Sequence, residues 1–393
     1  MDSRHIPLKP IAWNEDTART TVRAICDDAL DRFDRVKLWP AHPADEWCRD
    51  GETSLYWGAA GVILALAELG ETGRLDLTGV FPRLLEHNRA AMAQMSAYFG
   101  FDPAQASWLL GDVGILLLEM RLAPSPTIAD ELEARIAANL ALPPLELMWG
   151  MPGTMLAAHF LHAMTGEARW CELHQAQAEK LIGDLHESDA GPIWTQKLYG
   201  RTSQFLGLAH GLAGNVFALL RGWDWLNERQ RDTVRLLATH TLATQAARGE
   251  NGVNWRADAM KDDAPSLTQI CHGAPGMIAA FADMHLDAPE LRALLEGGGE
   301  WIWRAGPLAK GCGFCHGTAG NGYALLKLYA FTRQPVWLER ARAFAMNAIA
   351  QWQDAQAREG RGRYSLWTGD TGLAIFLRDC IVGVPGFPTL DVF

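Results

Sequence analysis

Seven stretches of the chain share one hydrophobic pattern, in which a G-x-x-G motif opens a run rich in Ala, Leu, Ile, Val and Met. The first glycines of these motifs are Gly58, Gly111, Gly150, Gly211, Gly273, Gly317 and Gly369. Each run is apolar on nearly every side, which is typical of a helix that is buried all round. Because the pattern returns at intervals of roughly 40 to 60 residues, it indicates a repeat architecture.

Amphipathic segments with the 3.6-residue helical period lie between these runs, and strand-like alternation is absent. They span Asp16–Val36, Gly79–Phe99, Ile128–Leu140, Glu167–Glu187, Asn227–Ala247, Asp287–Arg304 and Pro335–Gln353. One exposed helix thus alternates with one buried helix, and helix-on-helix packing buries both sets of apolar faces. We therefore predict an all-α fold, an α/α toroid (barrel) of seven helical hairpins, with an inner ring of seven buried helices and an outer ring of seven amphipathic helices.

No linker rich in Pro and Ser divides the chain, so residues 1–393 are predicted to form a single toroid domain. The motif glycines are expected to permit turns with positive φ and a close approach of the backbone. Equivalent repeats would place all seven motifs at one end of the toroid, where helix N-termini surround a central cavity. The unpaired N–H groups and helix dipoles would favour anionic species there.

The composition is that of an ordinary soluble protein, with 49% hydrophobic and 21% charged residues. A net charge of −11 argues against a nucleic-acid partner, because phosphate binding needs a basic face. The N-terminus lacks the apolar core of a signal peptide, and no apolar run of about 20 residues predicts a membrane span. Seven cysteines, an odd number in a long chain, do not resemble a disulfide framework. We expect a cytoplasmic protein with mostly buried free thiols.

The residues directly before the first glycine differ between the copies, and those of the fifth and sixth copies suit a metal. The fifth copy begins with Cys271, and the sixth begins with Cys315 and His316. Thiolate and imidazole are preferred zinc ligands, and three protein ligands with a vacant fourth position characterise catalytic zinc. The alternatives are polar residues that fill the core, Cys312 as a substitute ligand in the C-G-F-C sequence, and a c-type haem at C-x-x-C-H.

The other histidines carry less specific patterns. His210 precedes the first glycine of the fourth copy, as His316 does in the sixth, and this register favours an acid/base group over a core histidine. His272 has the same register in the fifth copy, where packing and function explain it equally well. His159 and His162 lie outside the register and are expected to be core histidines.

Six motifs also carry a family resemblance: SLYWGAAG, ELMWGMPG, FLGLAHGLAGN, CHGAPG, GFCHGTAGN and YSLWTGDTG. With them the chain resembles the lanthionine-synthetase C-like (LanC-like) family over essentially its full length. CHGAPG and the ending GFPTLDVF look closer to the stand-alone, glutathione-using LanC-like proteins of eukaryotes than to lantibiotic cyclases. The family fold is an α/α toroid of seven helical hairpins, which agrees with the repeat count.

The resemblance implies a zinc enzyme that adds a thiol to dehydroalanine or dehydrobutyrine residues in proteins or peptides, forming a thioether. It implies zinc ligation by the residues matching Cys271, Cys315 and His316, and an acid/base role for His210. Glu146 matches an acidic position of the third repeat, where it would orient His210 or the substrate, or cap a helix. In the eukaryotic branch of the family the thiol is glutathione, which is added to damaged proteins.

Three cations match basic positions of that branch, Arg4, Lys310 and Arg363, with Arg361 as an alternative to Arg363. They would bind the two carboxylates of glutathione; otherwise they are solvated surface residues. Leu267 stands where lantibiotic cyclases carry an arginine, which weakens the alternative of a lanthionine-forming peptide cyclase without excluding it. Two further interpretations are a non-catalytic zinc- and glutathione-binding sensor or scaffold, and a sugar-processing toroid, which would use paired carboxylates.

Overall fold

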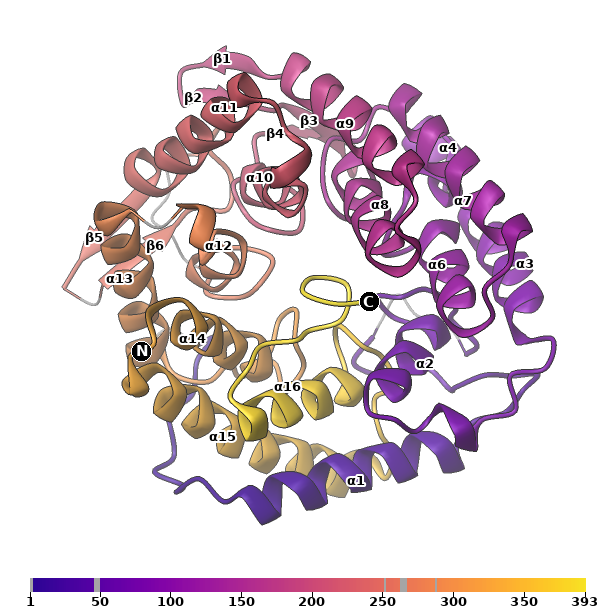
Figure 1. Cartoon of the computed structure of the whole chain (residues 1–393). Coiled ribbons are helices and arrows are strands. Elements are labelled where there is room, and N and C mark those ends of the chain that lie inside the picture. Colours follow the sequence, from indigo (N-terminus) through magenta and orange to yellow (C-terminus); the bar gives the residue numbers. More distant parts are fainter. Residues whose placement is uncertain (1–2, 46–49, 251, 262–266, 287) are drawn as a thin grey trace.

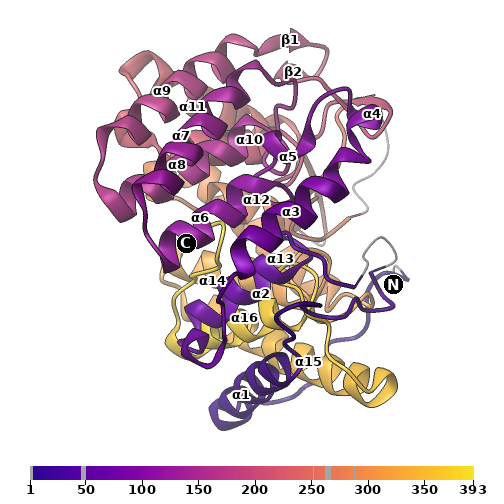
Figure 2. The same cartoon turned by 90° about the vertical axis from the view of Figure 1, so that its right-hand side faces the viewer.

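A computed structural model describes residues 3–45, 50–250, 252–261, 267–286 and 288–393. Its helices form two concentric rings around one axis, as Figure 1 shows. Figure 2 gives the side view, with the short helix α4 (Ser96–Phe99) toward one end of the ring and the C-terminus toward the other. The predicted all-α toroid is confirmed. That residues 1–393 form a single domain stays a prediction.

The inner ring consists of the seven apolar runs, and each helix begins directly after the first glycine of its motif. Consecutive inner helices are in contact, and the last one returns to the first, so the ring is closed. The predicted starts are therefore confirmed. The inner helices are α2 (Ala59–Glu68), α6 (Asp112–Leu122), α8 (Met151–Thr165), α10 (Leu212–Arg221), α12 (Ala274–Phe281), α14 (Thr318–Thr332) and α16 (Asp370–Val382).

The outer ring consists of the amphipathic segments, which turn their apolar faces toward the inner helices. Polar side chains fix several of its starts; for example, Asn227 and Gln230 form a capping box before α11. The outer helices are α1 (Glu15–Asp31), α3 (Val80–Ala93), α7 (Pro126–Ala138), α9 (Ala168–Gly183), α11 (Glu228–Thr239), α13 (Pro289–Ala305) and α15 (Pro335–Glu359).

Several outer helices end at other residues than predicted. Helix α1 stops five residues before Val36, because the Asp34 side chain accepts hydrogen bonds from the next backbone N–H groups and turns the chain. Helix α15 continues past Gln353 until Gly360, which ends it in the left-handed conformation with φ +65°. The predicted first residue of the sixth outer helix, Asp287, lies outside the described residues.

Short antiparallel hairpins and small helices connect the two rings, and the sequence pattern did not predict these strands. Each strand has only three or four residues, which is too short for alternation to be visible in the sequence. The hairpins pair β1 (His186–Ser188) with β2 (Gly191–Ile193), β3 (Gln196–Leu198) with β4 (Arg201–Ser203), and β5 (Ala246–Gly249) with β6 (Gly252–Trp255). The small helices are α4, α5 (Pro103–Ala106), the 3₁₀ turns 72–74, 139–141, 223–225 and 284–286, and the π-helix His240–Thr244.

The motif glycines are required mainly because a carbonyl oxygen packs against them. In all seven copies, a Cβ on the second glycine would lie 1.9–2.5 Å from the carbonyl oxygen six residues earlier. Positive φ, the other expected reason, applies among the first glycines only to Gly273, with φ +96°. The remaining six have extended backbone with φ between −106° and −144°. The close approach was predicted correctly, and the positive φ was wrong for these six.

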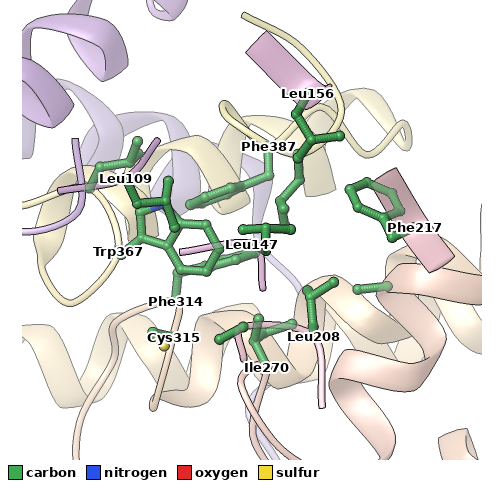
Figure 3. Close-up of a cluster of buried hydrophobic side chains, with 14 of the residues drawn as sticks. Leu109, Leu147, Leu156, Leu208, Phe217, Ile270, Phe314, Cys315, Trp367 and Phe387 are labelled. Atoms are coloured by element: carbon green, nitrogen blue, oxygen red, sulfur yellow. The ribbon is translucent and has the colours of Figure 1, made fainter. Parts of the chain in front are cut away.

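The seven residues whose carbonyls pack on these glycines also form an apolar ring around the axis. Each is at most 1% exposed, and Figure 3 shows four of them gathered with Phe387 from the C-terminal segment. Phe387 stacks on Phe314 with ring centroids 3.4 Å apart. The axis of the toroid is therefore filled by side chains. The ring residues are Leu55, Trp108, Leu147, Leu208, Ile270, Phe314 and Leu366.

The segment that follows α16 returns through the middle of the ring, where Figure 1 shows the C-terminus. Asp391 accepts hydrogen bonds from the Tyr323 hydroxyl at 2.5 Å and from Lys327 Nζ at 2.9 Å. The amide N–H of Phe387 donates to the same carboxylate at 2.9 Å. An aspartate whose side chain is largely shielded and has three donors fixes this segment against α14.

The turns of neighbouring repeats are joined by backbone hydrogen bonds. Each bond joins two residues that lie two positions before the first glycine of their motifs, and each runs from a backbone N–H to a carbonyl oxygen. The N–H of Leu109 donates to Met148, and the N–H of Tyr56 donates to Leu109. In the same way, the N–H of Trp367 donates to Tyr56, and the N–H of Cys315 donates to Trp367. The N···O distances are 2.6–3.4 Å. The chain of bonds runs across the closure between the last and first repeats and ends at a predicted metal ligand. Among the described residues, no helix combines the length and apolarity needed to cross a bilayer.

Candidate active site

The three predicted metal ligands come together at the turn end of the ring. Cys271 precedes α12, and Cys315 and His316 precede α14, so two adjacent repeats supply them. Their ligand atoms all lie within 4.8 Å of one another, and both cysteines are buried. Cys315 Sγ lies 3.7 Å from His316 Nε2. The structure brings the predicted set together, and its role as a metal site stays a prediction.

Two polar side chains that sequence reasoning missed hydrogen bond to the sulfur atoms. Gln269 Nε2 donates to Cys271 Sγ at 3.0 Å, and the Tyr56 hydroxyl bonds to Cys315. Donors to sulfur favour the thiolate, which is the form that binds metal, and fix its direction. The repeat register contained a signal for both residues, because Tyr56 aligns with Cys315 and Gln269 lies two residues before Cys271.

Burial opposes the ionisation of both thiols. At Cys271 the hydrogen bond with Cys315 and the charge of His316 outweigh burial, so the pKa of this thiol is lowered. At Cys315, burial and the neighbouring Cys271 both raise the pKa. The pair therefore favours one thiolate beside one thiol, and a bound divalent cation would ionise the second. Two buried thiols and an imidazole within this spacing fit zinc.

His210 is held by a buried carboxylate on the neighbouring repeat. Its Nδ1 lies 2.6 Å from one oxygen of Glu146, which is fully buried. The other oxygen of Glu146 accepts a hydrogen bond from the backbone N–H of Trp149. In the first two repeats a serine, Ser54 or Ser107, has the equivalent position and caps the turn in the same way. Glu146 thus caps a turn with one oxygen and contacts His210 with the other.

The two residues whose role the sequence left undecided lie beside the cluster. The ring centroids of His272 and His210 are 6.3 Å apart, Phe205 packs against both, and burial lowers the pKa of His272. Cys312 is not part of the ligand cluster formed by the described residues. Its Sγ lies 4.0 Å from Asp370, and burial raises the pKa of its thiol. The structure therefore does not support Cys312 as a substitute ligand.

A cavity of about 350 Å³ opens beside His316. Lys310 and Arg363 line it, whereas Arg361 does not appear in the lining that the described residues form. Arg4 is also outside this described lining; its side chain is exposed, and its carbonyl oxygen accepts a hydrogen bond from the N–H of Ala309. Two of the three predicted cations therefore reach one cavity next to the cluster.

Asp45 shares that cavity and pairs with Arg363 at two points. Arg363 Nε donates to Asp45 Oδ2 at 2.8 Å, and Nη2 donates to Oδ1. The Thr368 hydroxyl donates to the same carboxylate at 3.2 Å. Sequence reasoning missed Asp45, which belongs to no motif and is 318 residues from Arg363. An incoming carboxylate would thus meet a guanidinium that is already paired.

Fold and site together define an α/α toroid with a Cys₂His cluster on its turn end. Residues 49–391 match the family model "Lanthionine synthetase C-like protein", so the chain belongs to the lanthionine synthetase C-like family. The resemblance drawn from the motifs is confirmed, including its closeness to stand-alone LanC-like proteins, because relatives of that kind match the chain.

Two of these relatives are "Glutathione S-transferase LANCL1" of Danio rerio and "LanC-like protein GCL1" of Arabidopsis thaliana. The first is 32% identical over 198 residues, covering 48% of this chain and 46% of the relative. The second is 30% identical over 260 residues, covering 63% and 58%. The chain thus spans about half the length of the curated relatives it matches. The solved structure of nisin cyclase has a TM-score of 0.60 at 15% identity, covers 95% of this chain and 96% of its own, and shows the shared fold.

Proposed function

We propose that this protein adds glutathione to dehydroalanine or dehydrobutyrine residues of proteins or peptides and forms a thioether with the help of a bound zinc ion. One observation carries the proposal: the turn end of the toroid holds the Cys271–Cys315–His316 cluster, the His210–Glu146 pair and a cavity lined by two cations. The name of the zebrafish relative supports glutathione as the thiol.

The cluster supplies the ligands for the metal. Cys271, Cys315 and His316 would bind zinc, which acts as a Lewis acid that keeps a sulfur ligand in its thiolate form near neutral pH. Gln269 and Tyr56 hold the directions of the two protein sulfurs through their hydrogen bonds. Three protein ligands leave room for a substrate sulfur.

His210 would move the proton. Because the carboxylate of Glu146 accepts from Nδ1–H, Nε2 is the nitrogen that exchanges a proton with the substrate. Nε2 takes the proton of the incoming S–H group. Sulfur then bonds to the β-carbon, and the C=C electron pair shifts to give an enolate. His210 returns the proton to the α-carbon, so atoms and charge balance over the cycle.

The cavity would bind the rest of the thiol substrate. Glutathione carries two carboxylates and one ammonium group at neutral pH, and the lining offers Lys310, Arg363 and Asp45. Lys310 would pair with one carboxylate. Arg363 would bind the second carboxylate of glutathione and give up one of its two contacts with Asp45. The Asp45 carboxylate could then accept a hydrogen bond from the ammonium group. Arg4 remains the least supported of the three predicted cations.

The test combines metal analysis with turnover. Protein purified without added metal should contain about one zinc per chain and should form thioether from glutathione and a dehydrobutyrine peptide, seen by mass spectrometry. Zinc without turnover would replace the proposal by a non-catalytic binder. Turnover on a peptide with its own cysteine, but not with glutathione, would favour a cyclase.

A further inference from the structure

The hairpin of β3 and β4 places an unusual residue next to His210, and Figure 1 shows these strands beside α10. The turn between them consists of Tyr199 and Gly200, with φ of +53° and +70°. Glycine adopts this left-handed conformation readily, whereas a bulky aromatic residue seldom does. Such strain persists where the surrounding contacts enforce it, and it is concentrated at functional sites.

The contacts that hold Tyr199 belong to the candidate site. Trp149 Nε1 donates to the Tyr199 hydroxyl oxygen at 2.6 Å. The Tyr199 ring meets the His210 ring edge-on, with centroids 5.6 Å apart and planes at 85°. Gln196 on β3 donates to the backbone oxygens of Leu145 and His210, each at 2.8 Å. The hairpin is thereby fixed to the turns that carry the acid/base pair.

The Tyr199 hydroxyl has the properties of a hydrogen-bond donor to a substrate. Its oxygen already accepts from Trp149, and among the described residues the structure records no acceptor for its hydrogen. Burial, followed by the charge of Glu146, raises the pKa of the phenol, so it stays protonated at neutral pH. The residue is nevertheless 37% exposed, which leaves it accessible from outside.

Tyr199 and the cation cavity belong to different repeats of the ring. Lys310, Arg363 and Trp57 line that cavity from the sixth, seventh and first repeats. Tyr199 and His210 come from the fourth repeat and its preceding hairpin. A reaction between a thiol and a second molecule needs a separate approach to the cluster for each of them. The proposed function places the thiol in the cavity, because Lys310 and Arg363 there suit its carboxylates.

We propose that Tyr199 binds the acceptor: its hydroxyl donates a hydrogen bond to the carbonyl oxygen of the dehydroamino acid, beside His210. This inference rests on the proposed function. When sulfur bonds to the β-carbon, the C=C pair moves toward this carbonyl and the oxygen gains negative charge. Tyr199 stabilises that charge without giving up its proton, and the α-carbon receives its proton from His210. A fixed donor to a developing oxyanion accelerates reactions of this kind.

Tyr199→Phe is the test, because it keeps the ring against His210 and removes only the hydroxyl. The kcat for glutathione addition to a dehydrobutyrine peptide should fall about 10- to 1000-fold. The apparent KM for glutathione and the zinc content should stay unchanged, whereas the Tm should decrease slightly because Trp149 Nε1 loses its acceptor. A purely structural role would lower the Tm without lowering kcat, and rates within twofold of wild type would overturn the proposal.

Tyr98→Phe is the matched control, since Tyr98 is 57% exposed and lies in the same aromatic group, next to Phe99. It should leave the rate unchanged. Binding of the dehydrobutyrine peptide can be measured without thiol by tryptophan fluorescence. This measurement tests the contact between the Tyr199 hydroxyl and the acceptor separately from turnover. Tyr199→Phe should weaken this binding about fivefold. If both proteins bind the peptide equally, or if the wild type does not bind it, the proposal is overturned. If the wild type binds the peptide tightly and the binding depends on the hydroxyl, but no turnover is seen, only the proposed function is overturned.

Discussion

Histidines gather at both ends of the toroid, and the two groups have different partners. Those at the turn end are His210, His272 and His316, and those at the opposite end are His159, His162 and His174. At the turn end, His316 adjoins a thiol and His210 adjoins a carboxylate. At the other end, the three rings pack around Trp225, with centroids 5.1–5.7 Å from it.

The difference shows that the partner, rather than the histidine, decides the chemistry. His174 Nε2 donates to a backbone oxygen at 3.2 Å, and His159 accepts from Arg221 at 3.2 Å. Burial lowers the pKa of His159 to about 3 and that of His174 to about 4, so both stay neutral and act as polar packing residues. At the turn end, His316 and His210 instead adjoin a thiol and a carboxylate, the partners that the proposed metal binding and proton transfer need.

The largest effect is expected from removing a ligand at the turn end. Cys315→Ala should abolish stoichiometric zinc and thioether formation, because only two of the three protein ligands, Cys271 and His316, would remain. Metal content by elemental analysis checks this. Cys312→Ala is the control, since its sulfur lies outside the cluster that the described residues form, and it should keep one zinc per chain. Zinc retained by Cys315→Ala would exclude this ligand set.

The next effect concerns the acid/base pair. His210→Ala should retain zinc and lower the addition rate about 10²- to 10⁴-fold, the usual worth of a positioned proton-transfer group. Glu146→Gln should lower it as well, because an amide no longer favours the Nδ1–H form of His210. The control at the opposite end is His162→Ala, which should leave the rate unaltered. An unchanged rate in His210→Ala would remove His210 from the mechanism.

A smaller effect is expected in the cavity. Lys310→Ala should raise the apparent KM for glutathione roughly tenfold, which corresponds to about 1.4 kcal/mol for one charged contact. Steady-state kinetics at fixed acceptor concentration would measure it. Arg361→Ala, a nearby cation outside the described lining, should leave the KM alone. If both variants behave like the wild type, the cavity does not hold the carboxylates of the thiol.

The last effect concerns the free energy of unfolding rather than activity, and it depends on pH through His174. The pKa of His174 is lowered in the folded protein. The unfolded chain therefore binds a proton at His174 below about pH 6.5, whereas the folded chain binds it only near pH 4. The stability that neutral His174 provides is therefore complete above pH 6.5 and is lost as pH falls through this window. The loss is at most about 1.4 kcal/mol per pH unit.

His174→Gln keeps a donor for the backbone oxygen but does not titrate. Urea unfolding at pH 5 and pH 7 should show a smaller difference in unfolding free energy for this variant than for the wild type. An identical difference in both proteins would show that His174 does not carry the pH dependence.

The sequence was sufficient for the fold because its signal is repeated seven times. Every inner helix starts after the predicted glycine, since apolar runs and tight glycine contacts recur in one register. The hairpins could not be predicted, because strands of three or four residues show no period. The end of α1 depends on one side chain, Asp34, whose hydrogen bonds become visible only in the folded chain.

At the site, the register located the cysteines and histidines that directly precede a motif glycine or its neighbour, although Tyr56 shares the register and was missed. Cys271, Cys315, His316 and His210 all precede a motif glycine, so alignment of the copies exposed them. Asp45 and Tyr199 do not align with the repeat motif, so the comparison of the seven copies did not indicate them. Asp45 contacts Arg363 across 318 residues of the chain, and Tyr199 reaches His210 through the turn of a hairpin, and no local sequence feature encodes either contact.

The backbone hydrogen bonds between turns have a consequence for the order of assembly. Cys315 N–H donates to the carbonyl of Trp367, and Trp367 N–H donates to that of Tyr56. The backbone of one metal ligand is therefore fixed by the last repeat, which is fixed in turn by the first. During synthesis the thiols can reach their final geometry only after the ring has closed, so a growing or truncated chain lacks the complete site. Zinc bound at the proposed site would therefore report that folding is complete.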